Sequence, residues 1–226
     1  MKSPVQKPGC KALIFDMDGL MIDSERLYFE AQRDIAAAYD RSVDERTLWR
    51  MMGRKPLESL QIFIHDLGLS ISAEELLEIR NSIMRVKLTE DLRPLPGLTE
   101  IVQTFHGVLR LAVCTGAQGE FLDLVVDRLG MREKFTVLQS SDGIERGKPH
   151  PEIYLKTCVR LGLPPAWCVV LEDSENGVRA ATAAGCRAIA VPSRHTASQD
   201  FSAAHWIAMD LFEARNIIRD ILNPGA

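Results

Sequence analysis

Two aspartates, Asp16 and Asp18, follow a short apolar run and precede a glycine. The run at 12–15 reads Ala-Leu-Ile-Phe, which is typical of a buried strand in a parallel sheet. Open α/β sheets place their sites at the carboxyl ends of such strands, and Gly19 permits a turn that lets both carboxylates face one cleft. The pair can supply a nucleophile and a general acid and base, whereas an aspartate alone could simply cap the next helix.

A second acidic pair, Glu172 and Asp173, follows another apolar run at 168–171. Carboxylates gathered at one edge of a sheet repel one another, which raises their pKa values unless a cation lies among them. One or two carboxylates, waters and a substrate phosphate form the oxygen ligand set that suits Mg²⁺. The two acidic pairs together predict a magnesium site, and helix capping is the alternative for Glu172 and Asp173.

Two further groups follow apolar runs and suit the binding of an anion. Thr115 and Gly116 come after the run at 111–114, and offer a hydroxyl and backbone N–H groups to an oxyanion. Lys148 lies in a loop that Pro149 and Pro151 stiffen, so it can present a fixed positive charge to a phosphate. The alternatives are a threonine that leads into a helix and a solvated surface lysine.

The elements that position these groups follow from the hydrophobic pattern. Alternation of strands and helices after residue 97 predicts a parallel sheet with helices on both faces. We expect strands at 12–15, 109–114, 136–138, 168–171 and 188–191, and helices at 98–106, 120–129, 151–161, 175–184 and 211–222.

The segment after the first aspartate pair has a different character, because it contains only helical spacing. Helices are expected at 24–40, 45–52, 56–67 and 73–90. The predicted fold class is therefore α/β, with a Rossmann-like parallel sheet core and an inserted all-helical cap domain. We expect the core to comprise residues 1–22 and 92–226, and the cap residues 23–91.

Composition excludes some classes of function. The chain of 226 residues is 46% hydrophobic, which suffices for a sizeable core. Its net charge of −4 and the lack of a dense Lys/Arg run argue against a nucleic-acid partner. No apolar run approaches about 18 residues, and residues 1–9 lack the apolar middle of a signal peptide. We therefore expect no membrane contact and a cytoplasmic location.

The motifs in chain order resemble the four signature motifs of the haloacid dehalogenase superfamily: Asp16-x-Asp18-Gly19, Thr115-Gly116, Lys148-Pro149 and Glu172-Asp173. The insert after the first motif looks like the helical C1 cap of subfamily I, and the likeness extends from about residue 10 to residue 191. It is strongest to the branch that contains β-phosphoglucomutase and sugar-phosphate phosphatases. Within that branch, residues 13–28 and 51–55 look most like the pseudouridine-5′-phosphatase type.

This resemblance implies a Mg²⁺-dependent phosphomonoester hydrolase that acts on a small sugar phosphate or a nucleotide-like phosphate. Asp16 would attack phosphorus to form an aspartyl-phosphate, and Asp18 would protonate the leaving oxygen and then take a proton from water. Mg²⁺ would be held by the Asp16 carboxylate, the Asp18 backbone carbonyl and Asp173, with Glu172 as a further ligand or as the support of one.

The resemblance also assigns the phosphate contacts and the partner. Thr115, Gly116 and Lys148 would bind the phosphoryl oxygens, although Gly116 stands where many relatives carry Ser or Asn and offers only its backbone N–H. The partner would be a small phosphorylated metabolite, bound by a monomer.

Three other functions stay open at this point. A phosphomutase like β-phosphoglucomutase carries a histidine twelve positions after the nucleophile, where this chain has Tyr28. It also carries an arginine three positions after a cap-loop glycine, and the residue three positions after Gly53 in this chain is Pro56. A dehalogenase needs neither Asp18 nor the second acidic pair. A protein that only binds a phosphate ligand would be expected to lack one of the motif residues, and all are present.

Substrate selection is expected to lie in the cap, because a cap closes over the leaving group and excludes water. Arg54 and Lys55 follow Gly53 in this insert, and we expect both to contact the substrate; the alternative is two solvated cations. Arg54→Ala and Lys55→Ala should then each lower kcat/KM by about tenfold or more, as loss of a charged hydrogen bond does. Steady-state kinetics on the best phosphate ester would reject this assignment if both values were unchanged.

Overall fold

The computed structural model describes residues 9–51 and 56–223 of the chain. The chain divides into two compact units. The sheet unit comprises Met1–Ile22 and Pro94–Ala226, and the helical unit comprises Asp23–Arg93. Arg54 and Lys55, the cap residues expected to contact substrate, lie outside the described residues.

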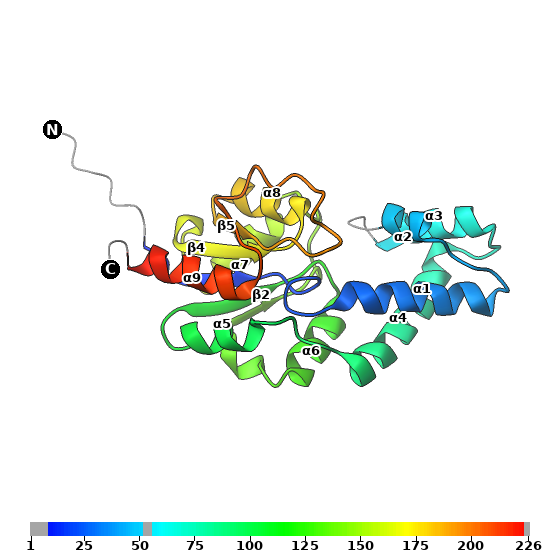
Figure 1. The fold of residues 1–226 in the computed structure, drawn as a ribbon, viewed down its shortest axis with the longest axis horizontal. Coiled ribbons are helices and arrows are strands. Elements are labelled where there is room, and N and C mark those ends of the chain that lie inside the picture. The colour runs from blue at the N-terminus through cyan, green and yellow to red at the C-terminus, as the bar shows by residue number, and fades with distance from the viewer. Residues whose placement is uncertain (1–8, 52–55, 224–226) are drawn as a thin grey trace. The chain divides into compact units, whose positions relative to one another are not determined.

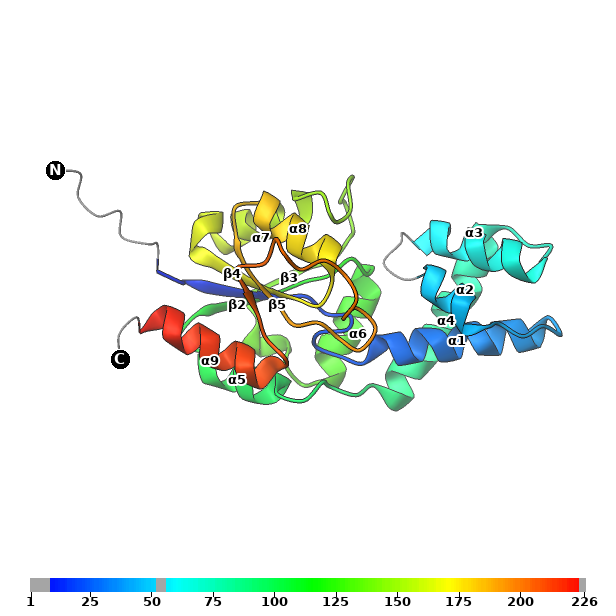
Figure 2. The same cartoon turned by 45° about the horizontal axis from the view of Figure 1, so that its top comes forward.

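A parallel sheet of six strands forms the centre of the described sheet unit, in the order β3-β2-β1-β4-β5-β6 (Figures 1 and 2). Every neighbouring pair in this order runs parallel. The strands are β1 (Ala12–Phe15), β2 (Arg110–Cys114), β3 (Val137–Gln139), β4 (Cys168–Glu172), β5 (Arg187–Ala190) and β6 (Trp206–Ile207).

Helices cover both faces of this sheet (Figure 2). Residues of α7 and α8 pack with Ile14 of β1 and Val170 of β4 in one buried cluster, while α5, α6 and α9 lie on the opposite face. All four residues of β1 are buried, as expected of a central strand covered on both sides. The helices are α5 (Leu98–Phe105), α6 (Gly119–Arg128), α7 (Glu152–Leu161), α8 (Glu175–Ala183) and α9 (Leu211–Leu222), with short 3₁₀ turns at Arg132–Lys134 and Pro165–Trp167.

The strand register brings three chain segments to one level. Phe15, the last residue of β1, pairs with Val113 of β2 and with Leu171 of β4. Beyond this point the backbone N–H of Asp16 donates to the Leu171 carbonyl at 3.0 Å. The residues that follow β1, β2 and β4 therefore emerge side by side at the carboxyl edge of the sheet.

The described residues of the helical unit form four helices and the segments that connect them. Its core includes Ile35, Leu48, Phe63 and Leu76, one from each helix, as the amphipathic spacing predicts. Arg26 forms ion pairs with Glu30 at 2.7 Å and Asp91 at 2.8 Å, so the two ends of the unit are tied together. The helices are α1 (Ser24–Ala38), α2 (Glu45–Met51), α3 (Pro56–Leu67) and α4 (Ala73–Asp91).

The predicted α/β class, with a parallel sheet and a helical insert, is confirmed. The sequence missed β6, which has two residues, and placed β3 one residue too early because Thr136 is exposed and lies outside the strand. Across residues 9–51 and 56–223, every helix is too short or too polar to cross a membrane.

Gly97 provides a test of how the sheet unit is packed, because it lies at φ +90° directly before α5 and against α9. A Cβ atom there would lie 3.0 Å from the Leu211 Cβ and 3.1 Å from the Phe212 nitrogen. Gly97→Ala should therefore combine left-handed backbone strain of ~1–2 kcal/mol with overpacking of ~1–3 kcal/mol. The free energy of unfolding in urea measures the loss.

Gly107→Ala is the matched control, because Gly107 has φ +81° and a Cβ atom there would meet nothing within 4 Å. This variant should lose only the backbone term. Equal losses in the two variants would show that the approach of α9 to Gly97 contributes nothing.

Candidate active site

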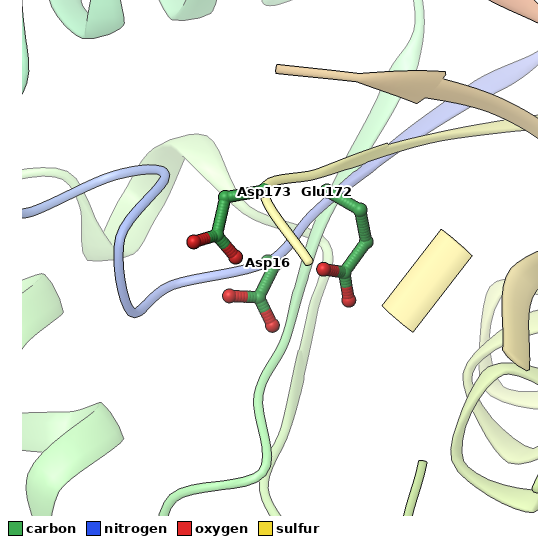
Figure 3. A group of neighbouring side chains, drawn as sticks. All are labelled: Asp16, Glu172 and Asp173. Atoms are coloured by element: carbon green, nitrogen blue, oxygen red, sulfur yellow. The ribbon is translucent and has the colours of Figure 1, made fainter. Parts of the chain in front are cut away.

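Acidic side chains from two neighbouring strands converge at the carboxyl edge of the sheet (Figure 3). Asp16 follows β1, Glu172 is the last residue of β4, and Asp173 follows it. Each offers a carboxylate oxygen, and these oxygens lie within 4.8 Å of one another. The exposed fractions are 6% for Asp16, 0% for Glu172 and 5% for Asp173, so three carboxylates share one buried space.

This group of three has the composition of a site for a hard divalent cation. Its donor atoms are all oxygens, and buried carboxylates at this spacing need a positive charge among them. Asp16, Glu172 and Asp173 were all predicted as metal ligands from the sequence, and the structure brings them together. The fourth predicted ligand is Asp18, through its backbone carbonyl, and the Asp18 side chain accepts a hydrogen bond from Thr115.

Lys148 supplies a positive charge to the same space. It comes from the loop between β3 and α7, and its Nζ lies 2.5 Å from both Asp16 Oδ1 and Glu172 Oε1. Its third neighbour is the Cys114 carbonyl at 3.5 Å. Burial alone would lower the Lys148 pKa, but the charges of Asp16 and Glu172 outweigh it and raise the pKa well above its ordinary value. Lys148 is therefore an ammonium held between two carboxylates and not a solvated lysine.

The pKa of Asp16 depends on its burial and on the charged side chains around it. Burial is the largest cause that raises the Asp16 pKa, the Lys148 charge opposes it, and the charges of Glu172 and Asp18 add to it, so that the resulting pKa is about 8. In the protein without metal, Asp16 thus takes up a proton near neutral pH. A bound cation would favour the ionised carboxylate, because opposite charges stabilise the charged form.

Thr115 and Asp18 form a second contact at this edge. The Thr115 hydroxyl donates to Asp18 Oδ2 at 3.1 Å and accepts from the Ala117 N–H at 3.0 Å. Thr115 is fully buried at the end of β2, whereas Gly116 is exposed. The structure thus places both predicted phosphate contacts at the site edge, with the threonine side chain directed to Asp18.

Two glycines make room for the carboxylates. A Cβ atom at Gly19 would overlap the Asp173 carboxylate, and one at Gly177 would overlap the Glu172 carboxylate. Gly19 also has φ +73°, the conformation that the sequence analysis expected of the turn after Asp18. Gly177 lies in the first turn of α8, so Glu172 rests against a helix N-terminus, which favours negative charge.

Tyr154 is a site residue that the sequence analysis missed. It lies on α7, is fully buried, and its hydroxyl donates to Glu172 Oε1 at 2.5 Å. A buried tyrosine usually hydrogen-bonds its hydroxyl, which is the only sequence signal that could have pointed to a polar partner. Ser174 also binds Glu172, with its hydroxyl 3.0 Å from Oε2.

The family model for haloacid dehalogenase-like hydrolases matches residues 10–185. The chain is 36% identical over 181 residues to a phosphorylated carbohydrates phosphatase from Thermotoga maritima, covering 79% of this chain and 83% of that protein. It is 31% identical over 179 residues to the fructose-1-phosphate phosphatase YqaB from Escherichia coli, covering 79% of this chain and 95% of that protein.

Solved structures show the same fold. The crystal structure of a Thermotoga maritima protein provisionally named beta-phosphoglucomutase has a TM-score of 0.79 and 32% sequence identity. The match covers 94% of this chain and 100% of that chain.

Asp16→Asn should stabilise the metal-free protein at about pH 8.5, because it removes a buried negative charge while Lys148 keeps Glu172 as a partner. A carboxyl group whose pKa is higher in the folded than in the unfolded protein contributes its full stabilisation only below the unfolded pKa of about 4. This contribution is lost as the pH rises through the pKa of the folded protein. We expect a gain of ~1–2 kcal/mol that shrinks toward about pH 5, where the wild-type side chain is protonated.

Unfolding in EDTA across this pH range measures the effect. Asp220→Asn, at an exposed carboxylate on α9, is the control and should change the free energy of unfolding by less than about 0.5 kcal/mol, as surface substitutions usually do. A gain in the Asp16 variant that stays constant with pH would contradict the burial of this charge.

Proposed function

Because this chain belongs to the haloacid dehalogenase-like hydrolases, we propose that it is a Mg²⁺-dependent phosphatase for a small sugar phosphate or a nucleotide-like phosphate. The observation that carries the proposal is the buried Lys148 ammonium between Asp16 and Glu172, next to Asp173. Two of the named relatives are phosphatases of phosphorylated carbohydrates and of fructose 1-phosphate, which favours a sugar phosphate as the substrate.

Asp16 is the proposed nucleophile. One of its oxygens attacks phosphorus, the new O–P bond forms, and the P–O bond to the leaving alcohol breaks, so that an aspartyl-phosphate results. Water then attacks the same phosphorus, which releases inorganic phosphate and restores the Asp16 carboxylate. The contact between Lys148 and Asp16 Oδ1 supports this role, because it fixes the orientation of the carboxylate.

Asp18 is the proposed general acid and base. It donates a proton to the leaving oxygen in the first step and takes one from the attacking water in the second, which typically contributes ~10²–10⁴-fold to the rate. The hydrogen bond from Thr115 to Asp18 Oδ2 supports the assignment, because it holds the carboxyl group at the site edge.

The proposed metal site uses the Asp16 and Asp173 carboxylates and the Asp18 backbone carbonyl. When bound there, Mg²⁺ would offset the negative charge of the phosphoryl oxygens. The Glu172 oxygens already accept hydrogen bonds from Lys148, Tyr154 and Ser174, which favours a supporting position behind the ligands over direct ligation. Lys148 and the Thr115–Gly116 segment would bind the phosphoryl oxygens.

The helical unit is the proposed cap. It is inserted in the chain at Asp23, shortly after Asp18, and the chain returns to the sheet unit at Pro94. Such an insert is suited to select the leaving group and to exclude water, and Arg54 and Lys55 are the residues proposed to contact the substrate.

A phosphomutase is the second candidate, favoured by the likeness to the Thermotoga maritima protein provisionally named beta-phosphoglucomutase. Tyr28 and Pro56 stand where that reaction is expected to use a histidine and an arginine, so hydrolysis has the better support. A phosphatase needs only water as the second acceptor.

Magnesium-dependent release of inorganic phosphate from a panel of phosphate monoesters tests the phosphatase. We expect sugar phosphates to rank first, EDTA to abolish the release, and Asp16→Asn to lower kcat by ~10³-fold or more, because the nucleophile is lost. Asp220→Asn, at an exposed carboxylate on α9, is the matched control and should retain wild-type kcat.

The same protein is assayed with β-glucose 1-phosphate and its bisphosphate activator. Formation of glucose 6-phosphate without net phosphate release would replace the phosphatase with the mutase. Inactivity in both assays would favour the binding-protein alternative.

A further inference from the structure

Tyr154 lies behind the proposed reacting groups and contacts two of the residues that support them. Its hydroxyl donates to Glu172 Oε1 at 2.5 Å, and the Lys148 Nζ lies 5.1 Å from the centre of its ring. A cation within about 6 Å of a tyrosine ring is attracted to its face. Tyr154 therefore holds both members of the Lys148–Glu172 ion pair, one through its hydroxyl and one through its ring.

Both carboxylate oxygens of Glu172 accept hydrogen bonds. Oε1 receives the Lys148 ammonium and the Tyr154 hydroxyl, and Oε2 receives the Ser174 hydroxyl at 3.0 Å and its N–H at 3.4 Å. Its carboxylate also rests against Gly177. A carboxylate held in this way has one orientation, so it can serve as a fixed support for Lys148.

We propose that Tyr154 is a positioning residue for the reaction: its hydroxyl fixes Glu172, which fixes the Lys148 ammonium against the Asp16 nucleophile. This inference rests on the proposed function, because it gives Tyr154 a part in the same phosphoryl transfer. Three successive hydrogen bonds, each with 2.5 Å between donor and acceptor, connect Tyr154 to Asp16. They join the Tyr154 hydroxyl to Glu172 Oε1, Glu172 Oε1 to Lys148 Nζ, and Lys148 Nζ to Asp16 Oδ1.

A purely structural role for Tyr154 makes a different prediction. As a large buried side chain in the core beneath α7, Tyr154 fills space with its ring. Phenylalanine would fill the same space and keep the ring face toward Lys148, while only the hydroxyl would be lost. Tyr154→Phe therefore separates packing from positioning.

The kinetic test compares Tyr154→Phe with the wild type on the best phosphate ester with saturating Mg²⁺. We expect kcat to fall about 10–100-fold, the usual effect of losing a group that orients a catalytic one, with KM changed less than about twofold. The reason is that a displaced Lys148 weakens stabilisation of the charge that develops during transfer. An unchanged kcat would overturn the proposal.

Thr157→Val is the matched control. Thr157 lies on the same helix, is also fully buried, and its hydroxyl donates to the Ile153 carbonyl at 2.8 Å and not to a site carboxylate. Loss of this hydroxyl should leave kcat at the wild-type value. A loss of kcat equal to that of Tyr154→Phe would mean that any buried hydroxyl of α7 matters, and would overturn the proposal.

A double-mutant cycle shows whether Tyr154 acts through Glu172. In a Glu172→Gln background, Tyr154→Phe should lower kcat by less than about twofold further, because effects of residues in one network are not additive. Multiplicative losses in the double variant would show that Tyr154 acts independently of Glu172, contrary to the proposal.

A readout independent of activity is the ¹H–¹⁵N signal of the Lys148 ammonium in the metal-free protein, assigned by its loss in Lys148→Met. Tyr154→Phe should shift or broaden it, and Thr157→Val should not. If the wild type released no phosphate but this signal responded, the proposed function would fail while the contact stood. An unchanged signal in Tyr154→Phe would overturn the positioning role even in an active phosphatase.

Discussion

The charge of one buried lysine makes the rest of the site possible. Asp16, Glu172 and Asp173 could not share a nearly water-free space as free carboxylates, since each would be driven to take up a proton. Lys148 bridges two of them at 2.5 Å, and one ammonium among three carboxylates leaves the space two positive charges short of balance. That shortage suits a divalent cation, so the arrangement that is unfavourable in the metal-free protein has the charge and the oxygen donors that such a cation requires.

The register of the sheet places the carboxylates that follow or end β1 and β4. Because β1 pairs with β2 on one side and β4 on the other, the residues that follow three strands emerge at one level. Gly19 and Gly177 have no side chain, and a Cβ atom at these positions would overlap the carboxylates of Asp173 and Glu172. Binding groups held on rigid elements and packed from behind keep a more exact geometry than groups on free loops.

The sequence allowed a correct prediction wherever an apolar run ended in a polar residue. This pattern located Asp16, Thr115 and Glu172 at strand ends, and the match to the hydrolase family confirms the resemblance seen in their motifs. It could not find β6, because a two-residue strand has no run to detect. Nor could it find Tyr154, since periodicity assigns a side chain to the core but does not say which distant carboxylate it meets there.

The position of β1 in the sheet also has a consequence for biosynthesis. Asp16 is made early, but its partners Lys148, Glu172 and Asp173 lie far along the chain, and β4 is the neighbour that completes its pairing. A nascent chain that has not reached residue 173 contains Asp16 without the Lys148 ammonium or without the complete acidic cluster. The three carboxylates and Lys148 can therefore come together only after the ribosome has synthesised the chain beyond β4.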